Sequence, residues 1–263
     1  MTNKTNKYGV SRYVPEHVKR EIRQRCGFGC VICGLGFYDY EHFEPDFSEA
    51  KAHNPAGMTL LCPNCNQKRA RNRLSAEAVA LANAKPKCLQ QGFSKEQFDF
   101  STTPVYIRIG GIEIHNCKYI LVINDMPLIS ILPPLEEGQP VRVSGFFTDG
   151  DGNQTLTLLN NEWSADTGSW DVESIGPVIT IRSGPRNISL KIRLNPPHSL
   201  SIEQLQMKFE GYYIKCDTEH LEFSQDGENW SRFGAGIWSN TSGIAFNFRN
   251  SNERSANDRV YDF

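Results

Sequence analysis

Residues Leu60–Arg73 read LLCPNCNQKRARNR, and this stretch carries the strongest pattern in the 263-residue chain. Its Cys-x-x-Cys pair, Cys62 and Cys65, is separated by 28 residues from an earlier pair, Cys30 and Cys33. Two such pairs supply the four thiolates of a closed tetrahedral zinc site. Structural zinc contributes on the order of 10 kcal/mol to folding, which suits a segment with few large apolar residues. The spacing predicts one structural Zn²⁺ on these cysteines; free buried thiols are the alternative.

The remaining cysteines and the apolar pattern indicate the compartment. Five of the eight cysteines lie between Cys26 and Cys65, and in a cytoplasmic chain this clustering favours metal over disulfides. We expect Cys88, Cys117 and Cys216 to pack as small apolar side chains. Cys26 is expected to pack as well, with a role as a spare metal ligand as the alternative. Because there is no long apolar run, leader pattern or lipidation motif, we expect a soluble cytoplasmic protein without a membrane partner.

Charge and texture divide the chain into two parts. Residues 1–90 hold 14 of the 28 Lys and Arg but 8 of the 30 Asp and Glu, a balance of +6. The remaining 14 basic and 22 acidic residues give −8. We therefore predict a basic domain at 1–90, a linker at 91–103 and an acidic domain at 104–263. Helices are expected from Val14, from Asn64 or Cys65, and after an N-cap at Ser75, whereas the polar residues before Tyr13 are expected to be loose.

The acidic part has the texture of an all-β domain. From Val105 onward, short runs of alternating or β-branched residues are joined by turn sequences such as DGDGN and QDGENW. Alternation implies one solvated face, hence antiparallel pairing. A β-sandwich is favoured over a short β-solenoid, because no fixed repeat period is present. Trp163 and Trp170 are interpreted as packing at a sandwich edge, with stacking on a ligand as the alternative.

The residues between the cysteine pairs resemble those of the HNH family of ββα-metal nucleases. The resemblance rests on CVIC, the Glu41-His42 dipeptide followed by FEP, the run TLLCPNC and the cationic helix after it, and covers about residues 12–80. It implies an α+β arrangement overall, in which a treble-clef-like ββα-metal domain precedes the β domain.

The resemblance also implies roles for single residues. His42 becomes the general base, Glu41 a ligand of a catalytic divalent ion, and Asn66 a second ligand through its carbonyl oxygen. An imidazole that titrates near neutrality suits the first role, and oxygen ligands suit Mg²⁺ or Mn²⁺. At the position where the family usually has a loop-bracing Asn, this chain has Gly57, and Asn54 replaces it only if the loop is rearranged. We expect slower chemistry as a result; His53 is interpreted as a surface histidine.

The cationic run after Asn66 is expected to contact a nucleic-acid backbone without reading its sequence, with a solvated helix surface as the alternative. Its members are Lys68, Arg69, Arg71 and Arg73. The sequence therefore predicts an HNH endonuclease that hydrolyses DNA phosphodiesters, with bacterial antiviral defence or restriction as the setting inferred from common fusions. A zinc-braced binding module with weakened catalysis and an RNA-directed nuclease are the alternatives. Target specificity, the ligand of the β domain and a homo-oligomeric state are left open.

Overall fold

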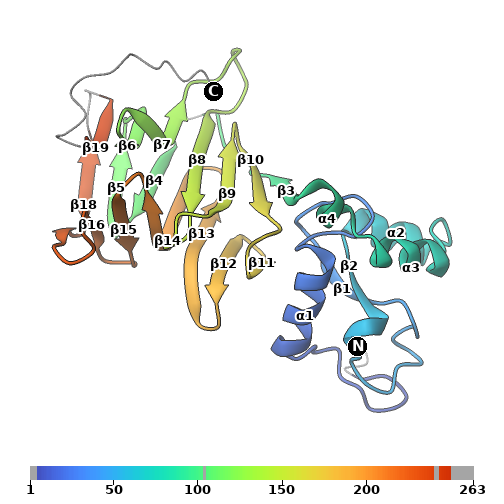
Figure 1. Cartoon of the computed structure of the whole chain (residues 1–263). Helices are drawn as coiled ribbons and strands as arrows, with labels where there is room; N and C mark the ends of the chain where they lie inside the picture. The colour runs from blue at the N-terminus through green and yellow to red at the C-terminus, as the bar shows by residue number, and fades with distance from the viewer. Residues whose placement is uncertain (1–4, 103–104, 240–242, 250–263) are drawn as a thin grey trace. The chain divides into compact units, whose positions relative to one another are not determined.

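The computed structural model describes residues 5–102, 105–239 and 243–249. The chain is mostly β-sheet with a few short helices, which agrees with the β-rich texture predicted for the larger part of the sequence (Figure 1). The helices are α1 (Glu16–Cys26), the 3-10 turn η1 (Pro55–Gly57), α2 (Pro63–Ala70), α3 (Ala76–Ala84) and α4 (Lys87–Gln91). The strands are β1 (Asp39–His42), β2 (Met58–Leu61), β3 (Phe93–Gln97), β4 (Tyr106–Ile109), β5 (Ile112–His115), β6 (Tyr119–Ile123), β7 (Met126–Leu132), β8 (Arg142–Thr148), β9 (Gln154–Leu159), β10 (Glu162–Asp166), β11 (Asp171–Ile175), β12 (Val178–Gly184), β13 (Asn187–Asn195), β14 (Ser199–Phe209), β15 (Tyr212–Cys216), β16 (Leu221–Ser224), β17 (Ser231–Phe233), β18 (Gly236–Ser239) and β19 (Ile244–Phe248).

Contacts group the chain into two compact units, each built from two segments. The first unit comprises residues 1–96 and 164–187, and the second comprises 97–163 and 188–263. The first unit thus includes the β11–β12 hairpin, which lies well outside residues 1–90. The segment 91–103, expected as a linker, contains β3 and the buried side chains of Phe98 and Phe100. Separate folding of the two halves stays a prediction.

In the first unit, α1, the antiparallel pair β1–β2 and α2 surround one apolar core. Val18 and Ile22 of α1 are buried in it, as the i, i+4 spacing predicts, and Gly27 ends the helix in the left-handed conformation. Ser75 caps α3, accepting a hydrogen bond from the Ala78 N–H, as expected. All four residues of β2 are buried, so the sheet holds the end of β1 firmly in place.

Residues 5–15, the described part of the segment before α1, make specific contacts, contrary to the expectation of a loose N-terminus; residues 1–4, on which the same expectation falls, lie outside the described residues. Thr5 and Ser11 form an antiparallel bridge. The Asn6 side chain donates to the carbonyl oxygens of Phe47 and Ala50, at 2.6 and 2.7 Å. These hydrogen bonds hold the loop between β1 and β2 against the N-terminal segment. No local sequence pattern predicts them.

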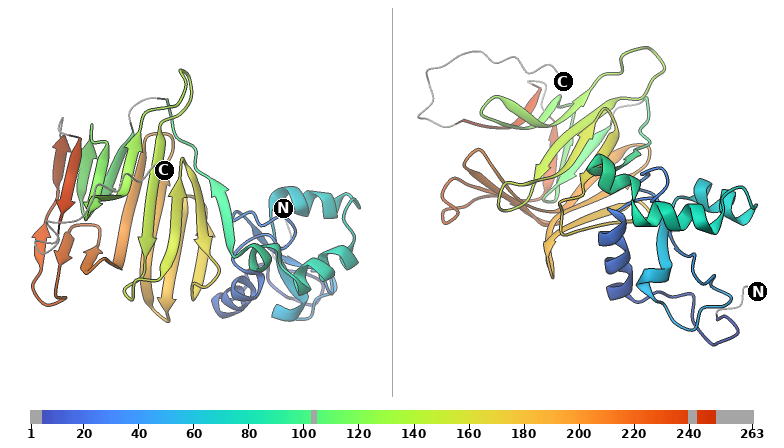
Figure 2. Two further views of the ribbon diagram at one scale, coloured as in Figure 1. Left: turned by 45° about the horizontal axis from the view of Figure 1, so that its top comes forward. Right: turned by 45° about the vertical axis from the view of Figure 1, so that its right-hand side comes forward.

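The second unit contains two sheets (Figure 2). One has the strand order β19-β6-β7-β8-β9 and the other β13-β14-β15-β16-β17, with β4, β5 and β18 alongside. Aromatic side chains from the two sheets contact each other. Phe146 of β8 meets Phe209 of β14, and Phe223 of β16 meets Phe248 of β19. Most neighbours are antiparallel, but β14–β4, β18–β5 and β19–β6 are parallel, so antiparallel pairing was predicted too broadly. Each parallel pair joins segments that are far apart in the sequence.

Candidate metal and catalytic site

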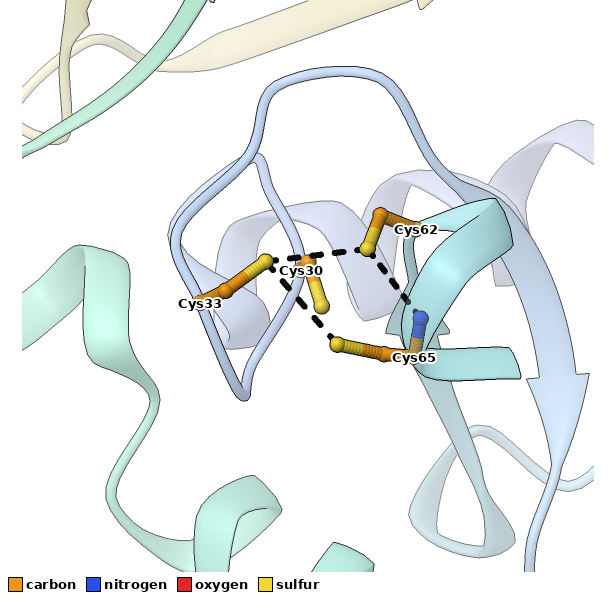
Figure 3. Close-up of side chains that lie close together, drawn as sticks. All are labelled: Cys30, Cys33, Cys62 and Cys65. Carbon is orange, nitrogen blue, oxygen red and sulfur yellow. Dashed lines mark hydrogen bonds between the residues drawn. The ribbon is translucent and has the colours of Figure 1, made fainter. Parts of the chain in front are cut away.

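The four cysteines of the two Cys-x-x-Cys pairs converge at one point. Cys30 and Cys33 lie in a tight turn after α1, closed by the bond from the Gly34 N–H to the Cys30 carbonyl oxygen, at 2.8 Å. Cys62 caps α2, and its sulfur accepts a hydrogen bond from the Cys65 N–H. Figure 3 shows the four thiols pointing toward one another. The turn and the helix start are thus the elements that bring the pairs together.

The spacing of the sulfur atoms fits a tetrahedral zinc ion. All four lie within 4.8 Å of one another, and Cys33 Sγ is 3.6 Å from Cys62 Sγ and 3.9 Å from Cys65 Sγ. A tetrahedron with Zn–S bonds of about 2.3 Å has edges of about 3.8 Å. The structure therefore confirms the predicted cysteine set as a group that could hold a metal, consistent with structural zinc.

The thiols of the cluster differ in pKa. A hydrogen bond involving Cys33 lowers the pKa of Cys30 to about 5, whereas the hydrogen bond with Cys30 raises the pKa of Cys33 and burial raises the pKa of Cys65 to about 12. A zinc ion binds thiolates, so its binding releases the remaining thiol protons. The other four cysteines are buried outside the cluster, as expected, and burial raises the pKa of Cys88 and of Cys216 to about 12.

Glu41 and Asn66, predicted as ligands of a second metal, are in contact. Glu41 lies on β1 opposite Thr59 of β2, and Asn66 lies on the first turns of α2. The Asn66 amide donates a hydrogen bond to the Glu41 carboxylate. Burial raises the pKa of Glu41, and the bond from Asn66 acts in the opposite direction. In the described part of the chain, the cysteine cluster is the only group of three or more His, Cys, Asp or Glu placed to hold a metal.

His42, the next residue of β1, is buried against the loop between β1 and β2. Its ring is 5.5 Å from the ring of Phe47, centroid to centroid. Its Nε2 lies 3.1 Å from Nδ1 of His53. Burial lowers the pKa of His42, and the neighbouring charge of His53 lowers it further. His42 is therefore held mainly neutral near pH 7, the state in which an imidazole accepts a proton.

His53 is the residue of this site that sequence reasoning underrated. Its Nδ1 meets His42, and its Nε2 lies 2.9 Å from the carbonyl oxygen of Ser11. The partner atom lies 42 positions earlier in the chain, in a segment that looked loose. Every residue has a backbone carbonyl, so the identity of Ser11 does not indicate that its oxygen contacts His53. The sequence therefore offered no means of finding this contact.

The loop around His53 is braced at Asn54 and Gly57. The Asn54 side chain caps η1, accepting from the Ala56 N–H at 3.1 Å. The Gly57 carbonyl oxygen accepts from the N–H groups of Phe43 and Glu44, at 3.0 and 3.3 Å. A Cβ on Gly57 would lie 2.0 Å from the Glu44 carbonyl oxygen. Asn54 therefore supports this loop, and position 57 has no room for a side chain.

The cationic residues after Asn66 divide into two kinds. Lys68, Arg71 and Arg73 are exposed. Arg69 is mostly buried, pairs with Asp46, and places Nη2 3.5 Å from the His42 carbonyl oxygen. Among the described residues, no group accepts a hydrogen bond from its buried Nη1. The Arg69 guanidinium thus lies near the backbone carbonyl of His42, and its Nη1 has no acceptor among the described residues.

No family model matches this chain, and neither does any curated protein or solved structure with which it was compared. Across the described residues, no helix has both the length and the apolar character needed to cross a membrane.

Proposed function

We propose that the chain is a metal-dependent endonuclease of the HNH type that hydrolyses DNA phosphodiester bonds. The observation that carries the proposal is the β1–β2–α2 arrangement, which joins Glu41 to Asn66 and buries His42 at the next position of β1. The cysteine cluster adjoins this arrangement, because Cys62 and Cys65 belong to the start of α2. These are the residues on which the sequence resemblance rests.

His42 would act as the general base. Its lowered pKa keeps it ready to take a proton from water. The water oxygen then bonds to phosphorus as the P–O bond to the leaving nucleoside breaks. A positioned base of this kind contributes about 10²–10⁴ to the rate.

Glu41 and Asn66 fit a hard divalent ion by their chemistry. The carboxylate offers oxygen, and the Asn66 amide has an oxygen as well as the nitrogen that faces Glu41. When bound, Mg²⁺ or Mn²⁺ would supply positive charge against the charge that develops on the phosphate. Two protein ligands leave room for water and phosphate oxygens, as is usual for Mg²⁺.

The cationic residues would hold the DNA backbone. Lys68, Arg71 and Arg73 are exposed and can approach phosphates, whereas Arg69 is mostly buried, and its Nη1 has no acceptor among the described residues. Each phosphate that such a residue neutralises releases counterions and steepens the salt dependence of binding. Such residues would contact phosphates and not base edges, so they would position DNA without selecting a sequence.

Plasmid relaxation tests the proposal. Wild-type protein should nick supercoiled DNA with Mg²⁺ or Mn²⁺ and stop when EDTA is added. His42→Ala should lose about 10²–10⁴ in rate with unchanged DNA affinity, because a base acts on the transition state. His17→Ala, at an exposed histidine of α1, is the matched control and should cut normally. Equal cutting by His42→Ala and wild type would remove His42 as the base and end the proposal.

A zinc-braced nucleic-acid-binding module without turnover is the second candidate. The observation in its favour is that, in the described residues, no third His, Cys, Asp or Glu joins Glu41 in a metal-binding group outside the cysteine cluster. This candidate predicts salt-sensitive DNA binding and no cleavage of DNA or RNA with any divalent ion. RNA in the same assay tests the RNA-directed alternative.

A further inference from the structure

We propose that His53 is a positioning residue that fixes the tautomer and ring orientation of His42, leaving Nδ1 of His42 as the atom that accepts the proton. This inference rests on the proposed function for the use of that atom, but the tautomer itself is a property of the chain alone. The geometry consists of two consecutive contacts. His42 Nε2 lies 3.1 Å from His53 Nδ1, and His53 Nε2 lies 2.9 Å from the Ser11 carbonyl oxygen.

The Ser11 carbonyl determines the direction of both hydrogen bonds. A carbonyl oxygen only accepts, so His53 Nε2 must carry a proton. In neutral His53, Nδ1 is then bare and can only accept. The proton shared between the two rings therefore belongs to Nε2 of His42. A neutral imidazole has one N–H, so Nδ1 of His42 keeps its lone pair.

The surroundings of the two rings keep this arrangement in place. His42 is buried and packs on Phe47, whose carbonyl oxygen is held by the Asn6 side chain. His53 precedes Asn54, which caps the turn leading into β2. Ser11 is paired with Thr5. His42, His53 and Ser11 thus all belong to backbone that other contacts hold in place. Rotation of either imidazole ring would break one of the two hydrogen bonds.

The charged groups near His42 and His53 do not reverse the direction of the two hydrogen bonds. Asp46 is the carboxylate that acts on His42, and its nearest partner is the Arg69 guanidinium. The Arg69 guanidinium in turn reaches the His42 backbone carbonyl and not the ring. The Glu41 carboxylate is engaged by Asn66. In the contacts that the structure gives, His53 is the polar partner of the His42 ring.

The first test is spectroscopic and needs no activity. In ¹⁵N-labelled full-length protein loaded with zinc, at a pH where both rings are neutral, long-range ¹H–¹⁵N correlation distinguishes the two tautomers. We expect His42 and His53 both to carry the proton on Nε2. In His53→Leu, the His42 nitrogens should shift towards tautomer-averaged values. A wild-type His42 protonated on Nδ1, or signals unchanged by His53→Leu, would overturn the proposal.

The second test is rescue by a conservative variant. In His53→Asn, the side-chain oxygen stands close to the place of Nδ1 and can accept the His42 proton. We expect His53→Leu to lower kcat by about 10- to 100-fold with unchanged DNA affinity, and His53→Asn to recover most of it. Thermal unfolding shows that both variants are folded. If folded Leu and Asn variants lose activity equally, or if His53→Leu cuts like wild type, the positioning role is wrong. If wild type never cuts, the proposed function fails and the tautomer measurement still decides this inference.

Discussion

At the scale of the residue, Gly57 shows how a close backbone approach limits what a position tolerates. An added Cβ would lie 2.0 Å from the Glu44 carbonyl oxygen, and that oxygen belongs to backbone that cannot simply rotate away. We expect Gly57→Ala to lower the free energy of unfolding by about 1–3 kcal/mol, as overpacking does. Gly184→Ala is the matched control, because its Cβ would meet nothing within 4 Å. Urea denaturation of both variants measures the difference.

The same geometry bears on the asparagine that the HNH resemblance would place at position 57. A branched polar side chain needs still more room than the Ala methyl group. We expect Gly57→Asn to be destabilised and to cut DNA no faster than wild type. Faster cleavage by this variant would mean that the loop relaxes and that Asn54 does not brace it.

A second prediction at this scale concerns the cysteine cluster. Cys62→Ser should lose zinc and stability together, because the free energy of metal binding is part of the free energy of folding. Cys26→Ala should keep one zinc per chain, since its sulfur contacts Thr59 and Asn83 and lies outside the cluster. Elemental analysis of protein purified without added metal measures both. Full zinc content in folded Cys62→Ser would contradict the assignment.

How much of the site the sequence predicts depends on how far apart the partners lie. The cysteine pairs and the Glu41-His42 dipeptide are short-range patterns. Their residue types alone indicate metal binding and proton transfer. The contact between Asn66 and Glu41 needed only the fold of one hairpin and one helix. His53 could not be recognised, because its role depends on the backbone oxygen of Ser11. The sequence also did not predict the partial burial of Arg69, because this side chain contacts the backbone oxygen of His42.

At the scale of the element, a buried ionic network joins α1 to the β11–β12 hairpin. Arg23 donates to both carboxylate oxygens of Asp171 at 2.8 Å and to Glu173 at 2.7 Å. Arg20 and Arg182 also pair with Asp171. The side chains of Arg23 and Asp171 are 1% and 0% exposed, so neither charge has water as an alternative partner. Losing the Asp171 charge leaves Arg23 with Glu173 as its one carboxylate, in a site that water does not reach.

We expect Asp171→Asn to lower the free energy of unfolding by about 3–5 kcal/mol for this reason. Glu49→Gln is the control within the same unit. It breaks the exposed pair with Lys7, and such pairs contribute less than about 1 kcal/mol. Urea denaturation compares the two variants. Similar small losses in both would show that water reaches the network.

The alternation that predicts strands is regular in some strands and interrupted in others. The run QTLTLL, which alternates, forms β9. The alternation is interrupted in β14, the longest strand of the described part of the chain. Its buried Leu200 and Ile202 are followed by Leu205 and Met207, so the alternation changes phase within the strand. A register shift against β13 accommodates the extra residue. A bulge of this kind is set by the partner strand and not by the local sequence.

At the scale of the whole molecule, each unit is assembled from two separate segments. The sequence analysis distinguished a basic first part from an acidic part rich in strands. Charge and periodicity could not reveal that residues 164–187 pack with the first unit. That grouping depends on Arg23 and its partners Asp171 and Glu173, about 150 positions later. Pairings over such distances leave no periodic trace in a single sequence.

A fragment of residues 1–103 should therefore be less stable than the same residues in the full chain. It keeps the cysteine cluster but lacks Asp171 and Glu173, the carboxylates that pair with Arg23 in the full chain. We expect Arg23→Met to change the stability of the fragment by less than about 1 kcal/mol, because water replaces the missing carboxylates there. We expect the same substitution to destabilise the full chain, where it leaves Asp171 without its main partner. Urea denaturation of the zinc-loaded proteins tests this, and an equal loss in both would show that the carboxylates do not matter to Arg23.

The distance between Arg23 and Asp171 along the chain also has a consequence for synthesis. The partners are 148 positions apart. At about 5–20 residues per second, the ribosome needs roughly 7–30 s to make the intervening polypeptide. During that interval α1 can form and the cysteines can take up metal, but the guanidinium has no carboxylate to bury against. Until the β11–β12 hairpin leaves the exit tunnel, the side of α1 that carries Arg23 therefore stays uncovered on the nascent chain, within reach of chaperones.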